Sequence, residues 1–194
     1  MSQSEPVNHN RRRVLIASTA AMGAAGGAAL LAPFVQSWSP SAKAEAAGAP
    51  VQIDTSSIEP GQMITVEYRK APVLVVKRTE EMLELLPKNV SQISDPESLQ
   101  SSQPEYAQNE TRSREPGLLV VSGVCTHLGC KPLFRPEVGA ADLGGDSWYG
   151  GFFCPCHGSK YDLAGRVFKG VPAPLNLPVP DYALNGNMLT VGEA

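Results

Sequence analysis

Two short cysteine and histidine segments constrain the fold of this chain more than any other feature of its sequence. Cys125–Cys130 reads Cys-Thr-His-Leu-Gly-Cys, and Cys154–Tyr161 reads Cys-Pro-Cys-His-Gly-Ser-Lys-Tyr. The two segments hold all 4 cysteines and two of the 3 histidines. Each follows a stretch of strand-like residues, Leu118–Val121 in one case and Ser147–Phe153 in the other, so each is expected to form a loop at a strand end.

Six potential metal-binding side chains in two loops are too many for a single tetrahedral metal ion, which needs four ligands. An economical division takes Cys125 and His127 from one loop and Cys154 and His157 from the other, and leaves two cysteines over. The C-x-H and C-x-x-H spacings match a [2Fe–2S] centre in which two histidines replace two cysteines on one iron. A structural zinc site is the alternative, and it gives the remaining cysteines no use.

The N-terminal part of the chain predicts a membrane anchor. No residue from Val14 to Ala42 is charged, and residues 14–38 would form a helix of about 37 Å, enough to cross a hydrocarbon core of about 30 Å. The three arginines at positions 11–13 would hold the N-terminus in the cytoplasm. The alternatives are a buried core helix, or an export signal that is removed at the small residues 44–46.

The remaining boundaries follow from composition. Residues 1–13 are interpreted as a cytoplasmic tail that includes a twin-arginine export signal, and His9 as a solvated residue of that tail. Residues 39–50, SPSAKAEAAGAP, are typical of a flexible or marginally helical tether. Residues 51–194 form the head, which carries 12 basic and 17 acidic residues. This negative charge argues against nucleic-acid binding.

The head is predicted to be mainly β. With 18 glycines and 17 prolines, the chain is unlike a helical bundle. Besides the two strands before the cysteine segments, we expect a hairpin, a short helix, a long polar surface excursion and a terminal hairpin. These correspond to Met63–Tyr68 with Val73–Lys77 around a turn at residues 69–72, to Glu80–Leu86, to Ser91–Gly117, and to Asp181–Leu184 with Met188–Val191 around residues 185–187.

Together these features resemble the Rieske iron–sulfur proteins of ubiquinol–cytochrome c reductase complexes. The resemblance rests on the two cysteine segments, on the Gly-Val-Pro-Ala-Pro sequence of residues 170–174, and on the order of anchor, tether and head. It implies an antiparallel β-sandwich head with a cluster-binding subdomain, preceded by a single transmembrane helix. Many family members have a glycine where this chain has Val171, which leaves the exact contacts of the proline loop open.

The resemblance also implies a role for each residue of the site. Cys125 and Cys154 would bind one iron of a single [2Fe–2S] cluster, and His127 and His157 the other. Cys130 and Cys156 would form a disulfide. The Ser159 hydroxyl would donate a hydrogen bond to a bridging sulfide, and the Tyr161 hydroxyl to the Cys125 sulfur. The remaining roles are a quinol-facing position for the ligand His157, and docking or shielding by Leu128 and Pro172.

The implied function is electron transfer from ubiquinol at cytochrome b to a c-type cytochrome subunit by movement of the head. The implied location is the bacterial inner membrane, with a single pass, a periplasmic head and a dimeric complex. The alternatives are the related subunit of a plastoquinol–plastocyanin reductase, and a Rieske ferredoxin or oxygenase component. The latter usually lack the extra cysteine pair and the anchor.

Overall fold

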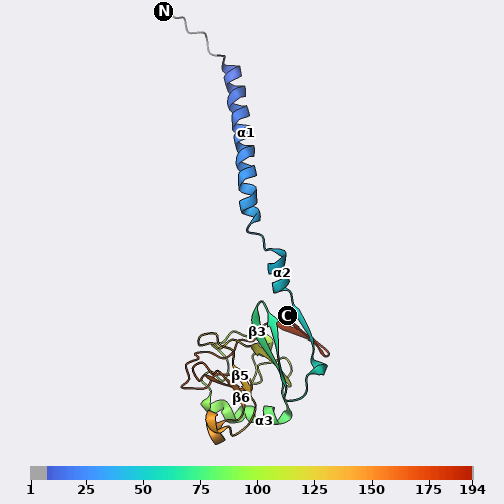
Figure 1. Cartoon of the computed structure of the whole chain (residues 1–194), viewed down its shortest axis with the longest axis vertical. Coiled ribbons are helices and arrows are strands. Elements are labelled where there is room, and N and C mark those ends of the chain that lie inside the picture. The colour runs from blue at the N-terminus through green and yellow to red at the C-terminus, as the bar shows by residue number, and fades with distance from the viewer. Residues whose placement is uncertain (1–7, 194) are drawn as a thin grey trace, which may run out of the picture. The chain divides into compact units, whose positions relative to one another are not determined.

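A computed structural model of the chain describes residues 8–193 (Figure 1). The chain divides after Ala46 into two compact units. Residues 1–7, which belong to the predicted cytoplasmic tail, lie outside the described residues.

The first unit is built on one long helix, α1, which covers His9–Gln36. Its first turn is capped by Asn8, whose side chain accepts a hydrogen bond from the backbone N–H of Arg11 at 3.1 Å. The helix therefore begins before the uncharged run and includes the three arginines that were predicted to precede it. It contains no buried residue and is long and apolar enough to cross a membrane.

A second helix, α2, covers Ala42–Gly48 in the middle of the predicted tether. Alanine is the strongest helix former, and this segment of seven residues contains four of them. Isolated helices of this length are marginal in water. The flexibility of residues 39–50 stays a prediction.

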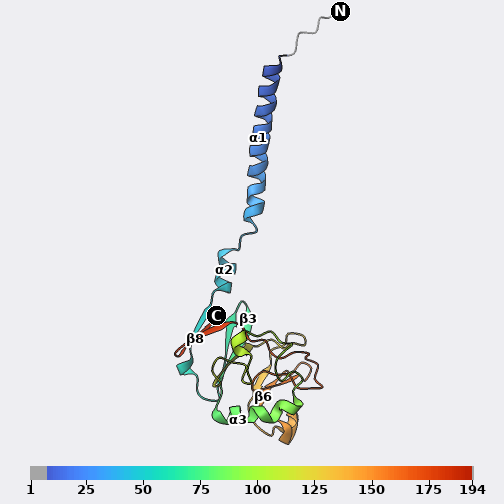
Figure 2. The same ribbon diagram turned by 180° about the vertical axis from the view of Figure 1, so that it is seen from behind.

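Within residues 51–193 the head contains three antiparallel sheets of three strands each, which confirms the predicted β architecture. Figures 1 and 2 show the head from opposite sides. The strand orders are β1-β9-β8, β2-β3-β4 and β5-β6-β7. The strands are β1 (Val51–Asp54), β2 (Met63–Tyr68), β3 (Ala71–Lys77), β4 (Leu118–Ser122), β5 (Leu133–Arg135), β6 (Gly151–Phe153), β7 (Lys160–Asp162), β8 (Tyr182–Asn185) and β9 (Met188–Val191).

The main core lies against the central strand β3 and its neighbour β4. Val73–Val76 and Leu118–Val121 are continuous apolar runs, and every residue in them is buried. One core cluster joins these strands to Phe152 and Tyr161 of the β5-β6-β7 sheet. The β5-β6-β7 sheet, whose strands adjoin the two cysteine segments, is therefore packed against the main apolar core of the head.

Several predicted element boundaries need correction. The first hairpin turns on Arg69 and Lys70 alone, both with positive φ, and Pro72 already lies in β3 opposite Glu67. Only Gly151–Phe153 of the predicted strand Ser147–Phe153 pairs as a strand, because the chain first closes a turn in which the Trp148 N–H donates to the Gly145 carbonyl.

The terminal hairpin and the helix of the head also differ slightly from the prediction. The hairpin turns on residues 186–187, since Asn185 pairs with Met188. The helix α3 covers Glu80–Asn89 and so continues through Pro87, beyond the predicted end at Leu86. Thr79 caps its start by accepting a hydrogen bond from the Met82 N–H at 3.3 Å.

The long polar segment between α3 and β4 is exposed over much of its length, as predicted, but it also carries buried polar side chains. Asp95, Ser98 and Arg112 are buried. The Arg112 guanidinium donates to the carbonyls of Ala164 at 3.1 Å and Leu177 at 2.8 Å. A buried charged group is tolerated because backbone acceptors surround it. The excursion is thus a structural strap that holds the residues following β7.

Candidate metal centre

The two cysteine segments fold into the same turn, as a loop after β4 and a loop after β6. In each turn a cysteine starts the loop, a glycine four residues later has positive φ, and two backbone hydrogen bonds close the loop. Positive φ is costly for residues with a Cβ, which explains the glycine at this position. The bonds are Cys125 N to Cys130 O at 2.8 Å, Gly129 N to Cys125 O at 2.9 Å, Cys154 N to Ser159 O at 2.8 Å and Gly158 N to Cys154 O at 3.0 Å.

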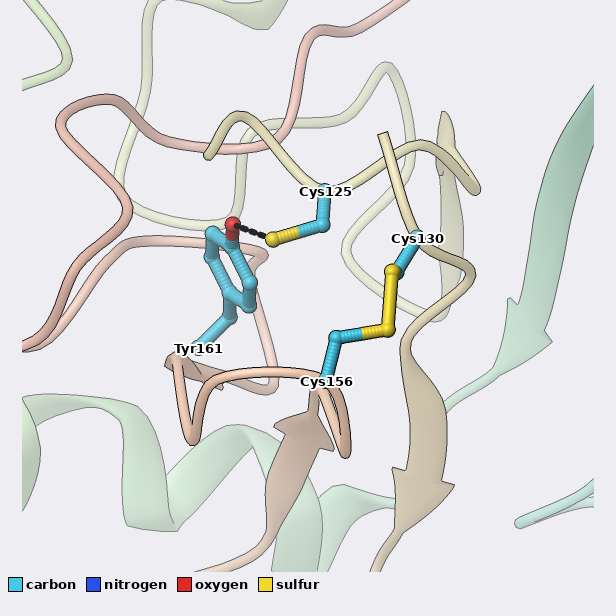
Figure 3. The surroundings of a disulfide bond; sticks show 4 residues. All are labelled: Cys125, Cys130, Cys156 and Tyr161. Atoms are coloured by element: carbon cyan, nitrogen blue, oxygen red, sulfur yellow. Dashed lines mark hydrogen bonds between the residues drawn. A yellow bond between two sulfur atoms is a disulfide. The ribbon is translucent and has the colours of Figure 1, made fainter. Parts of the chain in front are cut away.

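A disulfide between Cys130 and Cys156 joins the two loops (Figure 3). The two Cα atoms are 6.6 Å apart, and the two cysteines are separated by 26 residues in sequence. The Cys154 sulfur lies within 4.8 Å of both sulfurs of this bridge. Because the bridged sulfurs are already bonded to each other, Cys154 is the candidate ligand of this sulfur group.

Cys125 and Cys154 are the free cysteines of the head, and both are buried. Burial raises the pKa of the Cys125 thiol. Hydrogen bonds, chiefly those from the Tyr161 hydroxyl and the His127 backbone, lower this pKa by more than burial raises it, so it lies below its ordinary value. Burial and the neighbouring Cys125 sulfur raise the pKa of Cys154. A thiolate is the form that binds metal, and Cys125 is thus the more readily ionised of the pair.

The two histidines face each other at the loop tips. Their ring centroids are 4.7 Å apart at an interplanar angle of 89°. The Nδ1 atom of His127 is buried, and within residues 8–193 it makes no hydrogen bond. The side chain of His157 is exposed. An unpartnered buried imidazole nitrogen beside two free thiols is the donor expected of a metal ligand.

Tyr161 extends from β7 to the Cys125 sulfur, and its hydroxyl lies 3.1 Å from that atom (Figure 3). Burial, followed by the contact with Cys125, raises the pKa of the phenol, so Tyr161 keeps its proton and acts as the donor. The backbone N–H of Thr126 donates to the same hydroxyl oxygen at 3.2 Å. Thr126 was not assigned a role from sequence, although its place directly after a candidate ligand was the available signal.

Ser159 is fully buried, and its hydroxyl oxygen accepts a hydrogen bond from the Ala173 N–H at 3.0 Å. The hydroxyl proton of Ser159 is therefore left for another acceptor, and this hydroxyl contributes to the lowered pKa of Cys125. Ala173 belongs to the predicted proline loop, residues 170–174. Leu175 and Asn176 continue it, and from here the name covers residues 170–176, which contact both cysteine loops through Ala173 and Leu175. Leu128 (71% exposed) and Pro172 are at the surface, as the predicted docking roles require.

Comparison with known proteins shows the family to which the chain with this site belongs. The profile described as "Rieske [2Fe-2S] domain" matches residues 50–182. The ubiquinol-cytochrome c reductase iron-sulfur subunit of Allochromatium vinosum is 53% identical over 98% of this chain and 92% of its own length. The chain belongs to the Rieske iron–sulfur subunits of ubiquinol–cytochrome c reductases.

Other members support this assignment over nearly the whole Rieske chain. The iron-sulfur subunit from Bradyrhizobium diazoefficiens is 41% identical over 94% of each chain. A chain of a solved "Hyperthermophilic respiratory Complex III" covers 89% of this chain and 96% of its own, with a TM-score of 0.52 and 28% identity. A second profile, "Ubiquitinol-cytochrome C reductase Fe-S subunit TAT signal", matches residues 1–41.

The residues of this Rieske chain fit a single [2Fe–2S] cluster. Two free buried thiols and two facing imidazoles supply the mixed cysteine and histidine ligand set of such a centre. The disulfide accounts for the other two cysteines, and the match to the Rieske [2Fe-2S] profile favours an iron–sulfur cluster over zinc for the four remaining residues. His9, the third histidine, is exposed in α1 and has no part in the site.

Proposed function

We propose that this chain is the electron-transferring subunit of a ubiquinol–cytochrome c reductase, and that Cys125, His127, Cys154 and His157 hold its cluster. When bound, a [2Fe–2S] cluster of this kind accepts and releases one electron. The observation that carries the proposal is the pair of matching turns, which brings two free thiols and two imidazoles together from loops joined by a disulfide.

Tyr161 and Ser159 tune the site by hydrogen bonding. A hydroxyl that donates to a sulfur stabilises negative charge on it, and that charge is greater after reduction. The Tyr161 hydroxyl is directed at the Cys125 sulfur, and the Ser159 hydroxyl proton is not used by Ala173, which is itself a donor. Both donors therefore raise the reduction potential toward the upper part of the range of about −150 to +300 mV for Rieske centres.

His157 is the residue that meets the quinol. It is exposed, whereas His127 is partly buried. An imidazole bound to iron through one nitrogen still carries a proton on the other, and the metal charge lowers the pKa of that N–H. With the cluster bound and this second nitrogen deprotonated, His157 would be able to accept the quinol proton there. Leu128 and Pro172 form the apolar contact with cytochrome b.

The head shuttles between two partners. It docks on cytochrome b to receive the electron and then moves on residues 39–50 to deliver it to the c-type cytochrome subunit of a dimeric complex. Prolines that stiffen these residues should slow turnover without changing the reduction potential. Unchanged turnover in the stiffened variant would argue against head movement.

The chain is placed in the bacterial inner membrane, with its N-terminus in the cytoplasm and its head in the periplasm. The arginines at the start of α1 favour this orientation by the positive-inside rule. The Cys130–Cys156 disulfide suits an oxidising compartment.

Low-temperature electron paramagnetic resonance of the reduced full-length protein tests the assignment. We expect the spectrum of a [2Fe–2S] centre with mixed cysteine and histidine ligation. Cys154→Ser should abolish this signal, whereas His9→Ala, which changes a histidine outside the site, should leave it intact. A silent spectrum would indicate zinc. The spectrum of a cluster with four cysteine ligands would exclude His127 and His157 as ligands.

A further inference from the structure

The backbone of the proline loop contacts the hydroxyl groups on both sides of the site. The Ala173 N–H donates to Ser159 Oγ at 3.0 Å. The Leu175 carbonyl accepts from Thr126 Oγ1 at 2.6 Å, and Thr126 Oγ1 lies 3.2 Å from the Tyr161 hydroxyl. The Ala173 N–H therefore decides where the hydroxyl proton of Ser159 points, whereas Thr126 Oγ1, whose proton goes to Leu175, can only accept from Tyr161.

The loop ends at Asn176, whose side chain is fully buried and has every polar atom occupied. Its Oδ1 accepts from the Val167 N–H at 2.7 Å. Its Nδ2 donates to the Asp95 carbonyl at 2.9 Å and to Ser98 Oγ at 2.7 Å. Its own backbone N–H donates to Ser101 Oγ at 3.0 Å.

Three of these four partners of Asn176 come from one turn, which we call the Asp95 turn (residues 95–101). The Asp95 carboxylate accepts from the backbone N–H groups of Leu99 at 2.9 Å and Gln100 at 3.1 Å. Ser98 lies in the same turn and is buried. Its φ of 55° is a conformation that a serine adopts only when its surroundings impose it. The Asp95 turn is thus a fixed base for Asn176.

We propose that Asn176 is a positioning residue that sets the reduction potential without touching the cluster ligands. It fastens the end of the proline loop to the Asp95 turn and to Val167, and the loop in turn directs the hydroxyl of Ser159 through the Ala173 N–H. When Asn176 is lost, the Ala173 N–H shifts, and the Ser159 hydroxyl points less well at sulfur. This inference rests on the proposed function, because it acts through the tuning role assigned to Ser159.

The test compares reduction potentials of full-length, membrane-bound variants, followed by the circular dichroism of the cluster. Asn176→Ala should lower the potential, by less than Ser159→Ala does, because the hydroxyl remains but is misdirected. Thr55→Ala is the matched control, since Thr55 is also buried and donates to a carbonyl, that of Asn187 at 2.9 Å, in the β1-β9-β8 part of the head. Its potential should equal that of the parent.

A double-mutant cycle separates positioning from general destabilisation. If Asn176 acts through Ser159, Asn176→Ala should lower the potential less in a Ser159→Ala background than in the parent. Additive shifts, or an unchanged potential in Asn176→Ala, would overturn the inference. If Asn176→Ala fails to load the cluster, Ser101→Ala replaces it. That variant removes the acceptor of the Asn176 N–H and the contact of the Ser101 hydroxyl with the Asp95 carboxylate at 3.4 Å, and it should give a smaller shift in the same direction.

The outcomes also distinguish this inference from the proposed function. A parent protein without the expected resonance signal would overturn the proposed function and the inference together. An unchanged potential in Ser159→Ala would overturn the tuning role and the inference. A lowered potential in Ser159→Ala combined with the parent potential in both Asn176→Ala and Ser101→Ala would overturn the inference alone.

Discussion

The β2-β3-β4 sheet and the β5-β6-β7 sheet are both antiparallel and both contribute to one core, yet they are stabilised differently. The first has strands of 6, 7 and 5 residues, with the apolar runs of β3 and β4 buried. The second has strands of 3 residues each. Short strands offer little apolar area and few ladder hydrogen bonds. The second sheet depends on other bonds.

Those other bonds are polar and covalent, and they converge on the loops of the β5-β6-β7 sheet. The Cys130–Cys156 disulfide joins its two loops, and Arg112 and Asn176 hold the segments that follow β7. Each apolar side chain buried in the larger sheet contributes about 1.5–3 kcal/mol without requiring a particular angle. Hydrogen bonds and disulfides require defined geometry. The β2-β3-β4 sheet therefore supplies stability, whereas the β5-β6-β7 sheet supplies the placement of the ligands.

The strongest test of this division removes a ligand. Cys125→Ser should abolish cluster binding, because a serine hydroxyl does not replace a thiolate on iron at neutral pH. The larger sheet should remain folded, since its apolar contacts are unchanged apart from one sulfur. Iron content and hydrogen exchange of the β3 amides measure the two effects.

Leu74→Ala is the converse variant, since Leu74 is fully buried in β3. It should lower the free energy of unfolding by about 2–5 kcal/mol, while the protein that remains folded still binds iron. Loss of β3 protection in Cys125→Ser, or loss of iron from folded Leu74→Ala, would show that the two sheets are not separable.

The sequence predicted the larger sheet better than the smaller one, for the same physical reason. Val73–Val76 and Leu118–Val121 are buried on both faces, so they are continuously apolar and visible as strands. Lys160–Asp162 contains two charged residues around Tyr161 and was missed as a strand, because its pairing with β6 and the buried ion pair of Asp162 with Arg166 override its composition.

The site was predicted from the ligand types, but its supports were not. The disulfide was expected from the family resemblance and is present, and the contact between Tyr161 and Cys125 was expected in the same way. The contribution of Asn176 has no local sequence signal, since its side-chain partners lie near residues 95–98 and 167. Polar contacts between distant segments depend on the finished fold.

Removing the disulfide should give the next largest effect. In the chain-entropy account, a bridge that closes 26 residues stabilises the folded state by about 3.5 kcal/mol. Changing both Cys130 and Cys156 to alanine should therefore lower the unfolding free energy by up to this amount and speed hydrogen exchange in the two loops first. The β3 amides serve as the internal control. Equal acceleration in both sheets would contradict the separation of roles.

At alkaline pH, ionisation of Tyr182 in β8 should lower the free energy of unfolding of the head. Burial raises the pKa of Tyr182 to about 12, whereas a phenol in the unfolded chain ionises near 10. The folded state therefore keeps a proton that the unfolded state loses. The stability that this group contributes is complete below about pH 10 and is lost as the pH rises to about 12, a loss of roughly 2 kcal/mol. Chemical denaturation at several pH values should show that Tyr182→Phe loses less stability over this range than the parent.

Tyr161→Phe should give the smallest change in free energy and the most local one. It removes the hydroxyl 3.1 Å from the Cys125 sulfur and keeps the ring in the core. A hydrogen bond to a charged sulfur contributes about 1–2 kcal/mol, which for one electron corresponds to a potential lower by roughly 40–90 mV. Redox titration measures this shift, and quinol oxidation should slow with it.

Tyr182→Phe makes the same chemical change at a second fully buried tyrosine, whose hydroxyl accepts from the Arg114 N–H at 2.8 Å instead of donating to sulfur. It should alter stability and leave the potential at the parent value. If the two substitutions shift the potential equally, the effect belongs to the core as a whole. If only Tyr161→Phe shifts it, a single hydroxyl of the smaller sheet adjusts the electron affinity of the site without drawing on the stability that the larger sheet provides.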